Sequence, residues 1–369
     1  MAYPAIAAIT RVAGGPFEFE EVELDALREN EVLVRIEACG ICHTDRKFQD
    51  RLTLPAVFGH EGTGIVEETG VDVTSVTPGD RVIISYPWCG QCPSCRHSEP
   101  YRCEVIPALK FGGHRSDGTA TISLNGEPIT SAFFQQSSFA TRAIALEHAL
   151  VPVEGETDPE VLAALPCGVQ TGAGAVLNTF AMNEEHSLVM FGVGTVGLSA
   201  IMAARMAGVA TRIAVDVVPE RLEKALALGA THAFDARDDE MVTQIRAILP
   251  HGASHSLESS ITVEALEAAI DVLGQGGKVG VFSAPPPGQK FPFTTRGLFD
   301  RVGSLHGIVQ GFSVPREFLP RLIRLQRSGD LPFERLVSVY DFRDIDRAFA
   351  DAEAGSVIKP VLRMAGDRD

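Results

Sequence analysis

The chain has 369 residues, 45% of them apolar and 22% charged, an ordinary balance that excludes a disordered or fibrous protein. At about 100–200 residues per domain, this length predicts two or three domains. Acidic residues outnumber basic ones by 48 to 32, and a net charge of −16 disfavours binding to a nucleic acid backbone. No stretch is expected to reach the roughly 18 apolar residues of a membrane helix, and the N-terminus does not resemble a signal peptide. The sequence therefore predicts a cytoplasmic protein with neither nucleic acid nor membrane as a partner.

Two kinds of local pattern follow one another along the chain. The alternation at residues 31–37 and the Val/Ile-rich pieces between glycines at 59–80 predict a small, mostly β region. From about residue 160, Ala-rich helical segments alternate with short apolar strands, which predicts a parallel sheet covered on both faces. The expected strands are 187–192, 212–218, 277–285 and 359–364, the expected helices are 195–208, 220–230, 315–329 and 344–355, and a Pro-rich loop is expected at 285–288.

Four of the seven cysteines lie within fifteen residues, at Cys89, Cys92, Cys95 and Cys103. Thiols at this spacing can enclose one tetrahedral zinc ion, and a set made only of thiols is typical of a structural site. A ferredoxin-like cluster and a zinc finger are competing interpretations. The rest of the sequence has no ferredoxin character, and the acidic charge argues against a nucleic-acid finger.

A second candidate metal set consists of Cys42, His60 and Cys167. Two sulfurs and one nitrogen would give a zinc ion three protein ligands and leave one open position, as catalytic zinc sites require. The spacing alone leaves a second interpretation equally open, in which His60 is a core histidine and Cys167 a small buried side chain.

A glycine fingerprint follows the apolar strand expected at 187–192 and opens a helix. Its glycines are Gly192, Gly194 and Gly197, and the acidic Asp216 lies nineteen positions after the last of them. In this context the pattern predicts a dinucleotide site, in which the pyrophosphate lies at the helix N-terminus beside Thr195 and Val196. A carboxylate at Asp216 favours NAD over NADP because it would repel a 2′-phosphate.

These motifs together resemble the zinc-containing, medium-chain alcohol dehydrogenases over nearly the whole chain. The matching segments are CGICHTD at 39–45, GHEGTGIVEETGVDV at 59–73, the four-cysteine segment, PCGVQTGAG at 166–174, FGVGTVG at 191–197 and AVDVVPERLEKALALGA at 214–230. Within that family, the segment FLPRLIRLQRSGDLPFERLVSVYDF at 318–342 is similar to the aryl-alcohol, benzyl alcohol-type branch.

The resemblance implies an α/β fold with two domains. A GroES-like, mostly β catalytic domain would comprise residues 1–168 and 307–369 and carry the structural-zinc lobe at 89–103. A Rossmann NAD-binding domain with a parallel six-stranded sheet would comprise residues 169–306. A homo-oligomer, either a dimer or a tetramer, is also implied.

The resemblance assigns roles around two zinc ions per chain. It makes Cys42, His60 and Cys167 the catalytic ligands and leaves Cys39 as a non-ligand, and the other four cysteines would hold the structural ion. By the same matching, Asp45 would orient the ligand histidine.

Further roles follow from matched positions. Glu61 would lie behind the metal, and Thr44 would bond the substrate oxygen. His43 and Lys359 match cationic positions beside the cofactor pyrophosphate, and Arg221 matches a basic residue near the adenosine ribose.

The implied reaction interconverts a primary alcohol and an aldehyde by hydride transfer to NAD, with zinc polarising the substrate oxygen. Aryl or allylic alcohols are the expected substrates. The candidate pocket aromatics are Phe48, Tyr86, Trp88, Phe111, Phe133, Phe134 and Phe139. Two alternatives are a zinc-free type of quinone or enone reductase and a non-catalytic protein that binds NAD and zinc.

Two positions depart from the family pattern. Lys47 stands where many relatives place a histidine that ends a proton relay, so either its pKa is lowered or water takes the proton. The segment 257–266 carries serines where relatives often have Thr-Gly beside the cofactor, which leaves the conformation of that loop open.

Overall fold

We describe a computed structural model of the chain, which covers residues 2–283 and 295–364. The internal contacts divide it into two compact units. The first comprises Met1–Cys167, Val314–Arg324 and Phe333–Asp369, and the second comprises Gly168–Ser313 and Leu325–Pro332. Residues 307–313, which the sequence assigned to the catalytic domain, belong by their contacts to the second unit, as does the short segment from Leu325.

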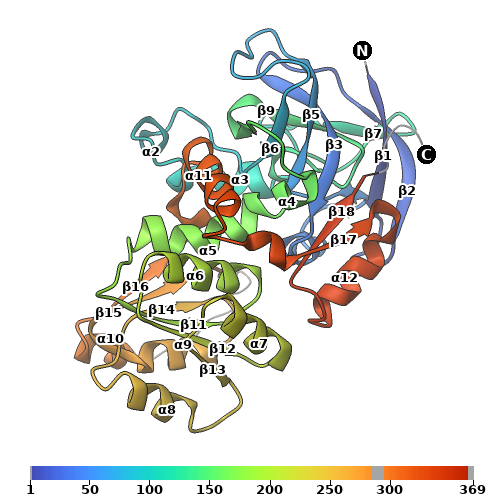
Figure 1. Cartoon of the computed structure of the whole chain (residues 1–369). Helices are drawn as coiled ribbons and strands as arrows, with labels where there is room; N and C mark the ends of the chain where they lie inside the picture. The colour runs from blue at the N-terminus through green and yellow to red at the C-terminus, as the bar shows by residue number, and fades with distance from the viewer. Residues whose placement is uncertain (1, 284–294, 365–369) are drawn as a thin grey trace. The chain divides into compact units, whose positions relative to one another are not determined.

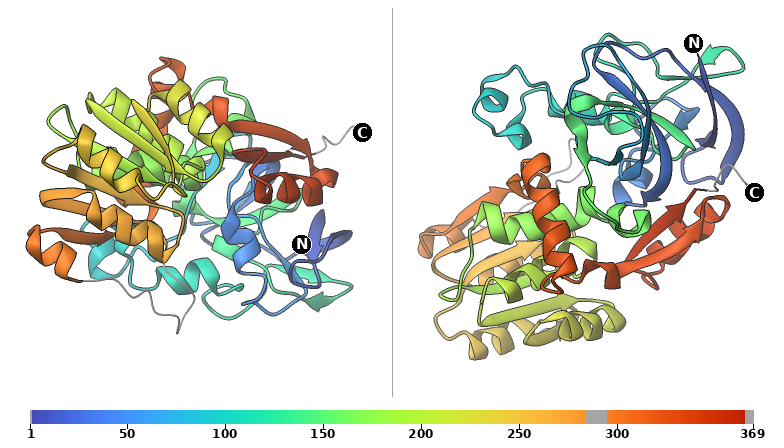
Figure 2. Two further views of the ribbon diagram at one scale, coloured as in Figure 1. Left: turned by 90° about the horizontal axis from the view of Figure 1, so that it is seen from below. Right: turned by 45° about the horizontal axis from the view of Figure 1, so that its top comes forward.

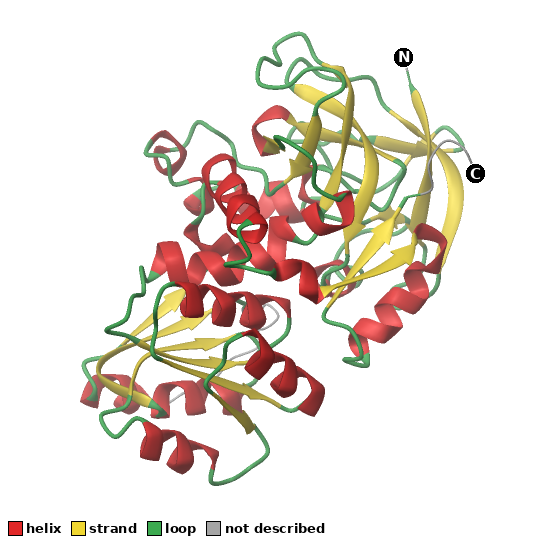
Figure 3. Ribbon diagram, viewed as in Figure 1, coloured by secondary structure: helices red, strands yellow, loops and turns green. Residues whose placement is uncertain are grey.

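The first unit is built on two sheets of mostly antiparallel strands (Figure 3). One sheet has the order β4-β1-β2-β7-β8, and the other has the order β10-β6-β5-β3-β18-β17 with β9 paired to β3. The strands are β1 Tyr3–Thr10, β2 Phe17–Leu24, β3 Glu31–Gly40, β4 Ala56–Val57, β5 Gly62–Thr69, β6 Arg81–Ile84, β7 Ile122–Leu124, β8 Glu127–Pro128, β9 Arg142–Leu146, β10 Leu150–Pro152, β17 Val337–Asp341 and β18 Lys359–Arg363. Alternation at 31–37 predicted β3, whose Val32, Val34 and Ile36 are all buried.

Short helices connect these strands, and the C-terminal part of the chain returns to the first unit. Figure 2 shows β17 and β18 beside α12, and the register pairs Leu362 of β18 with Cys39 of β3. Two segments far apart in sequence thus share one sheet. The helices are α1 His43–Lys47, α2 Pro93–Arg96, α3 Ile106–Phe111, α4 Pro159–Leu162, α11 Pro315–Arg327 (which runs into the second unit) and α12 Ile345–Glu353.

The second unit is a six-stranded parallel sheet with the order β13-β12-β11-β14-β15-β16. Figure 1 shows α6 and α7 on one face and α8, α9 and α10 on the other. The strands are β11 Ser187–Phe191, β12 Thr211–Asp216, β13 His232–Asp235, β14 Ala253–Glu258, β15 Leu273–Val281 and β16 Ser304–Gly307; the helices are α5 Gln170–Gly174, α6 Thr195–Met206, α7 Pro219–Leu228, α8 Met241–Ile248, α9 Val263–Asp271 and α10 Thr295–Asp300. The predicted fold, with a Rossmann-type sheet in one unit and a GroES-like β structure in the other, is confirmed.

One expectation about membrane helices was wrong. The helical segment Pro159–Thr179 is long and apolar enough to cross a membrane by length and composition, although 78% of its apolar window is buried inside the protein. That degree of burial is what a core helix shows. The Pro-rich loop expected at 285–288 lies outside the described residues.

Candidate metal and dinucleotide sites

The four-cysteine segment folds into a compact thiol cluster. The sulfur atoms of Cys89, Cys92, Cys95 and Cys103 all lie within 4.8 Å of one another. Cys89 and Cys95 are 3.9 Å apart between sulfurs, close to the roughly 3.8 Å that two Zn–S bonds of about 2.3 Å make at a tetrahedral angle.

Backbone groups in this lobe already favour thiolates. The N–H of Cys92 points at Sγ of Cys89 at 3.3 Å, and the N–H of Cys89 points at Sγ of Cys103 at 3.3 Å. Backbone hydrogen bonds, first from Glu104 and then from Cys95, lower the pKa of Cys92 to about 6. A positive φ of 71° at Gly90 makes the turn that brings these groups together. The cluster therefore fits a four-thiolate zinc ion.

A second cluster, called here the ligand set, contains Cys42, His60, Glu61 and Cys167, and its ligand atoms also lie within 4.8 Å of one another. Cys42 caps the N-terminus of α1, where its sulfur accepts from the Thr44 N–H. His60 and Glu61 lie between β4 and β5, and Cys167 lies in the π-helical turn Leu165–Val169. Single π-helical turns often occur at functional sites. The Cys42 and Cys167 sulfurs are 3.9 Å apart, which again suits tetrahedral zinc.

Asp45 holds His60 and the backbone of Cys42 in place by hydrogen bonds. Its carboxylate is fully buried, and it accepts hydrogen bonds from His60 Nδ1 at 2.8 Å, from the Gly59 N–H at 3.1 Å and from the Cys42 N–H at 3.0 Å. Burial acts to lower the pKa of His60, but Asp45 and Cys42 outweigh it and raise the pKa to about 10.

The other nitrogen of His60 carries the metal argument. Nε2 is buried without a hydrogen-bond partner among the described residues. A buried ring nitrogen without a hydrogen-bond partner, beside two thiols, suits a metal ligand, and Asp45 would hold the ring in the tautomer that presents Nε2 to a metal ion. The donor set therefore fits zinc.

Glu61 is held by a cation rather than left free toward the sulfurs. The buried Lys359 ammonium forms an ion pair with Glu61 and donates to the Ile41 carbonyl at 3.0 Å. Burial raises the pKa of Glu61 to about 7, and Lys359 opposes the rise. Lys359 is 2% exposed. Its predicted contact with a cofactor pyrophosphate stays a prediction.

A strained loop supports the ligand set from its other side. Ala132, Phe134, Gln135 and Ser137 all have φ between 53° and 59°, a region that non-glycine residues rarely adopt. Such clustered strain is found where function requires it. It places the Phe134 ring against His60, with centroids 4.3 Å apart and planes 24° apart.

Gln136, in the same loop, was not predicted. Its amide donates to the His60 carbonyl at 3.0 Å and accepts from the Gly62 N–H at 3.1 Å. It thereby fixes the backbone on both sides of Glu61. A lone glutamine in a polar stretch gives no sequence signal for this role.

The predicted pocket aromatics fall into two groups. Phe48, Phe111 and Phe134 form one connected wall, with Phe48 and Phe111 stacked at 4.0 Å and Phe111 edge-on to Phe134 at 5.4 Å. Phe139 instead packs on Phe17 in the β core. Of the remaining three, Tyr86 and Phe133 are buried and Trp88 is partly buried; Phe133 packs on Phe48, and Trp88 packs on Tyr86.

Lys110, which sequence analysis did not single out, lies beside this wall. Its ammonium lies 5.0 Å from the ring centre of Tyr86 and 5.2 Å from that of Phe134. Burial lowers its pKa to about 8.

Two further predicted residues, His43 and Lys47, lie on α1. His43 is exposed. Partial burial, and then the charge of Arg51, lower the pKa of Lys47, the direction that a proton-relay role requires.

In the second unit the glycine fingerprint forms the turn between β11 and α6. Gly192 has a φ of +82°, and a Cβ on Gly197 would lie 2.1 Å from the Gly192 carbonyl oxygen. A Cβ on Gly194 would meet nothing within 4 Å, so open space lies in front of the N-terminus of α6, where Thr195 and Val196 begin the helix. A helix N-terminus facing open space through a glycine fits a pyrophosphate.

Asp216 ends β12 with its carboxylate beside this turn. It accepts from the N–H groups of Val193 at 2.7 Å and Val218 at 3.0 Å. The Arg221 Nε is buried with no partner among the described residues. Ser259, in the loop whose conformation the sequence left open, donates to the Gly192 carbonyl at 2.9 Å and so ties the loop to the fingerprint.

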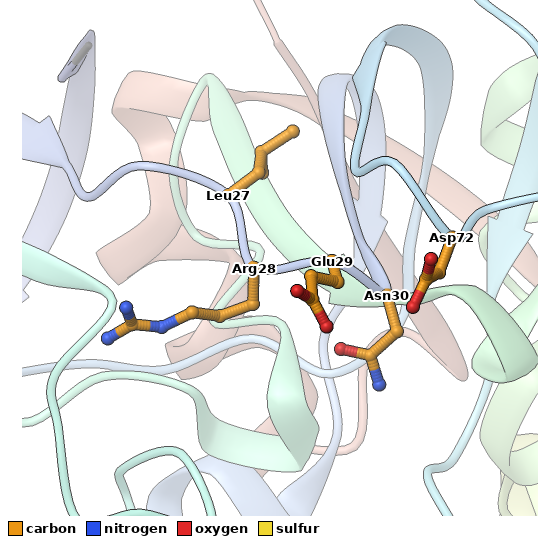
Figure 4. A pocket seen from close by; sticks show the side chains of 5 residues that line it. All are labelled: Leu27, Arg28, Glu29, Asn30 and Asp72. Atoms are coloured by element: carbon orange, nitrogen blue, oxygen red, sulfur yellow. The ribbon is translucent and has the colours of Figure 1, made fainter.

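A surface hollow of the first unit has no part in either cluster. Leu27, Arg28, Glu29, Asn30 and Asp72 line it (Figure 4), and none of them was predicted as a site residue.

Comparison with known proteins places the chain in a family. Residues 28–154 match the alcohol dehydrogenase GroES-like domain, and residues 195–325 match the zinc-binding dehydrogenase domain. A geraniol dehydrogenase of Castellaniella defragrans is 40% identical over 97% of both chains.

Two solved structures are similar over nearly their whole length. An alcohol dehydrogenase zinc-binding domain protein from Burkholderia ambifaria shares 44% identity, covers 99% of this chain and 100% of its own, and has a TM-score of 0.96. Benzyl alcohol dehydrogenase from Acinetobacter calcoaceticus shares 38% identity, covers 98% and 100%, and has a TM-score of 0.94. With its two thiol clusters and its glycine fingerprint, the chain therefore belongs to the zinc-containing, medium-chain alcohol dehydrogenase family.

Proposed function

We propose that this protein uses NAD to interconvert primary alcohols, of the aryl or allylic kind, and their aldehydes. The observation that carries the proposal is the ligand set, in which two sulfurs and the orphaned His60 Nε2 converge beside the Phe48–Phe111–Phe134 wall. The names of two relatives, a geraniol and a benzyl alcohol dehydrogenase, support an allylic or aryl substrate.

Cys42, His60 and Cys167 would hold the catalytic zinc, and Cys89, Cys92, Cys95 and Cys103 would hold the structural one. A bound zinc would supply Lewis acidity toward the substrate oxygen, and NAD would supply the hydride acceptor. Asp216, Arg221 and the three fingerprint glycines would bind NAD.

The chain's own groups would then position the alcohol and move its proton. The Thr44 hydroxyl, 3.5 Å from the Cys42 sulfur, lies where it can accept the proton of the substrate alcohol. His43, exposed on the same helix, would lie beside the cofactor pyrophosphate. The Phe134 ring would cover the reacting carbon and exclude water, and Asp45 would keep His60 oriented.

We propose a homo-oligomer in the cytoplasm that takes small-molecule substrates and binds neither nucleic acid nor membrane.

The test measures NAD⁺ reduction with benzyl alcohol, cinnamyl alcohol, geraniol, hexanol and sorbitol, together with zinc content per chain. We expect about two zinc ions per chain and the highest kcat/KM with the aryl and allylic alcohols. Cys42→Ala should abolish turnover and lower the zinc content by one ion per chain. Cys39→Ala, which removes a neighbouring thiol outside the ligand set, should retain both the turnover and the two zinc ions.

Two results would contradict the proposal. Zinc-independent reduction of quinones or enones would identify a reductase of the zinc-free type. Full zinc and NAD binding without turnover of any alcohol would identify a non-catalytic binding protein.

A further inference from the structure

Lys110 is a buried cation without an anion. Three Lys or Arg side chains are buried in residues 2–283 and 295–364: Lys110, Arg115 and Lys359. Arg115 is paired with Glu31 at 2.6 Å and Lys359 with Glu61. Lys110 is only 5% exposed, yet no carboxylate of the described residues lies within ion-pair distance of its ammonium. Its contacts there are the faces of Tyr86 and Phe134.

This cation borders the ligand set. The Phe134 ring that it contacts is the ring stacked on His60, so a single aromatic ring separates the Lys110 ammonium from a metal-binding histidine. The helix that carries Lys110, α3, is held in place because the Gln135 amide donates to the Leu109 carbonyl at 3.1 Å.

The free-energy cost of burying the Lys110 ammonium indicates that an anion binds next to it. Burying an ammonium without a counterion is costly, and aromatic faces return only part of that cost. A zinc ion with two thiolates is formally neutral, so the loaded ligand set would offer Lys110 no net negative partner. The anion has to arrive with a ligand.

We propose that Lys110 forms a carboxylate subsite, so that the preferred substrates are aromatic primary alcohols carrying a carboxylate group, the hydroxymethyl benzoates. The hydroxyl would lie at the metal position, the ring against the Phe48–Phe111–Phe134 wall, and the carboxylate at the Lys110 ammonium. This inference rests on the proposed alcohol oxidation and narrows its substrate class.

The kinetic test compares para- and meta-(hydroxymethyl)benzoate with the neutral para-methylbenzyl alcohol. In the unaltered enzyme we expect kcat/KM to be about 10- to 100-fold higher for one of the acids, the range of a charge-assisted hydrogen bond. Lys110→Met should remove this preference while leaving the neutral alcohol within about threefold, and Lys110→Arg should retain most of it. An equal loss for acid and neutral substrates would overturn the proposal, as would an unaltered enzyme without the preference.

A binding measurement separates this inference from the proposed function. Calorimetric titration of para-(hydroxymethyl)benzoate into the zinc-loaded protein, without NAD, should show binding that Lys110→Met weakens about tenfold or more. If this binding depends on Lys110 but no alcohol is oxidised, the proposed function fails and the subsite stands. If binding is equal in both proteins, the subsite fails even where neutral alcohols are oxidised.

Folding controls complete the design. Because Lys110→Met removes an unpaired buried charge and keeps the length of the side chain, it should unfold at the same or a higher temperature than the unaltered protein. A clear fall in melting temperature would assign Lys110 a structural role and overturn the proposal.

Discussion

Asp45 links three separate parts of the ligand set through one carboxylate. It bonds the His60 ring, the Gly59 backbone and the Cys42 backbone, and it is fully buried. Its negative charge raises the basicity of His60. Asp45 would thus influence a bound metal ion only through His60, by orienting its ring and raising its basicity. A substitution that keeps the side-chain shape but removes the charge can test this role.

Asp45→Asn should weaken zinc binding at the ligand set by about 10- to 100-fold, because the amide keeps the side-chain shape but removes the charge that orients and polarises His60. Competition with a chelator measures the affinity. Asp50→Asn, which removes an exposed carboxylate nearby, serves as the control and should change nothing. Unchanged zinc affinity in Asp45→Asn would show that the charge is not needed.

Individual residues also show how far the sequence could be interpreted. The four-cysteine cluster could be predicted because its members are local and their spacing is specific. Cys167 lies 107 residues after His60, so the spacing could only suggest them as one ligand set, and the family resemblance was needed to choose that interpretation over a structural one. Lys110 and Gln136 gave no signal, because a lysine on a short helix and a glutamine in a polar loop usually face solvent. Their importance depends on tertiary contacts.

At the N-terminus of α6, one glycine of the fingerprint is required for packing and another leaves space for a ligand. A Cβ at position 197 would collide with the Gly192 carbonyl, whereas a Cβ at position 194 would enter open space. The two glycines therefore serve different purposes.

Gly194→Ala should leave the melting temperature within about 2 °C and weaken NAD binding about tenfold or more, since the new methyl group would occupy space where the pyrophosphate lies. Gly197→Ala should instead destabilise the protein. Fluorescence titration with NADH and thermal melting distinguish the two effects. If Gly194→Ala binds NADH normally, the open space before α6 is not the pyrophosphate site.

A cluster of histidine and phenylalanine side chains on the second sheet should make the stability of that unit depend on pH. His255 of β14 is buried, packs on His186 and Phe180, and is accompanied by Lys278 of β15 and His306 of β16. Burial, followed by the charges of His186, Lys278 and His306, lowers the pKa of His255 to about 3.

The unfolded chain, with an ordinary histidine pKa near 6.5, therefore binds more protons than the folded one between about pH 6.5 and 3. Stability contributed by neutral His255 is present above pH 6.5 and is lost as the pH falls through this window, on the order of 2 kcal/mol between pH 7 and pH 5. His255→Phe should flatten this dependence in urea unfolding. His232→Gln, at an exposed histidine of β13, should not.

For the whole molecule, the two units divide the chemistry as well as the contacts. All seven cysteines, and hence both thiol clusters, belong to the first unit, while the glycine fingerprint belongs to the second. Fold class could be predicted from sequence for the same reason, because each unit has its own periodicity. The contact-based units differ from the predicted boundary at residue 307, because the resemblance gave no information on which contacts residues 307–313 make.

This division predicts separate responses to ligands. Removing zinc with a chelator should lower the melting transition of the first unit by several degrees and leave the second nearly unchanged, whereas NADH should raise the second. Scanning calorimetry, with Trp88 fluorescence as a reporter of the first unit, follows both. A single transition that both ligands shift equally would show that the units unfold as one.

The return of β18 to β3 also sets an order for biosynthesis. Cys42, His60 and Glu61 leave the ribosome early, but Lys359, the counterion of Glu61, follows about 300 residues later. Until then a carboxylate meant for the interior has no cation, and β3 lacks a neighbouring strand. A nascent chain can gather its cysteines early, yet the ion pair that holds Glu61 forms only once Lys359 of β18 has emerged, so a chain truncated before β18 lacks the counterion of that buried carboxylate.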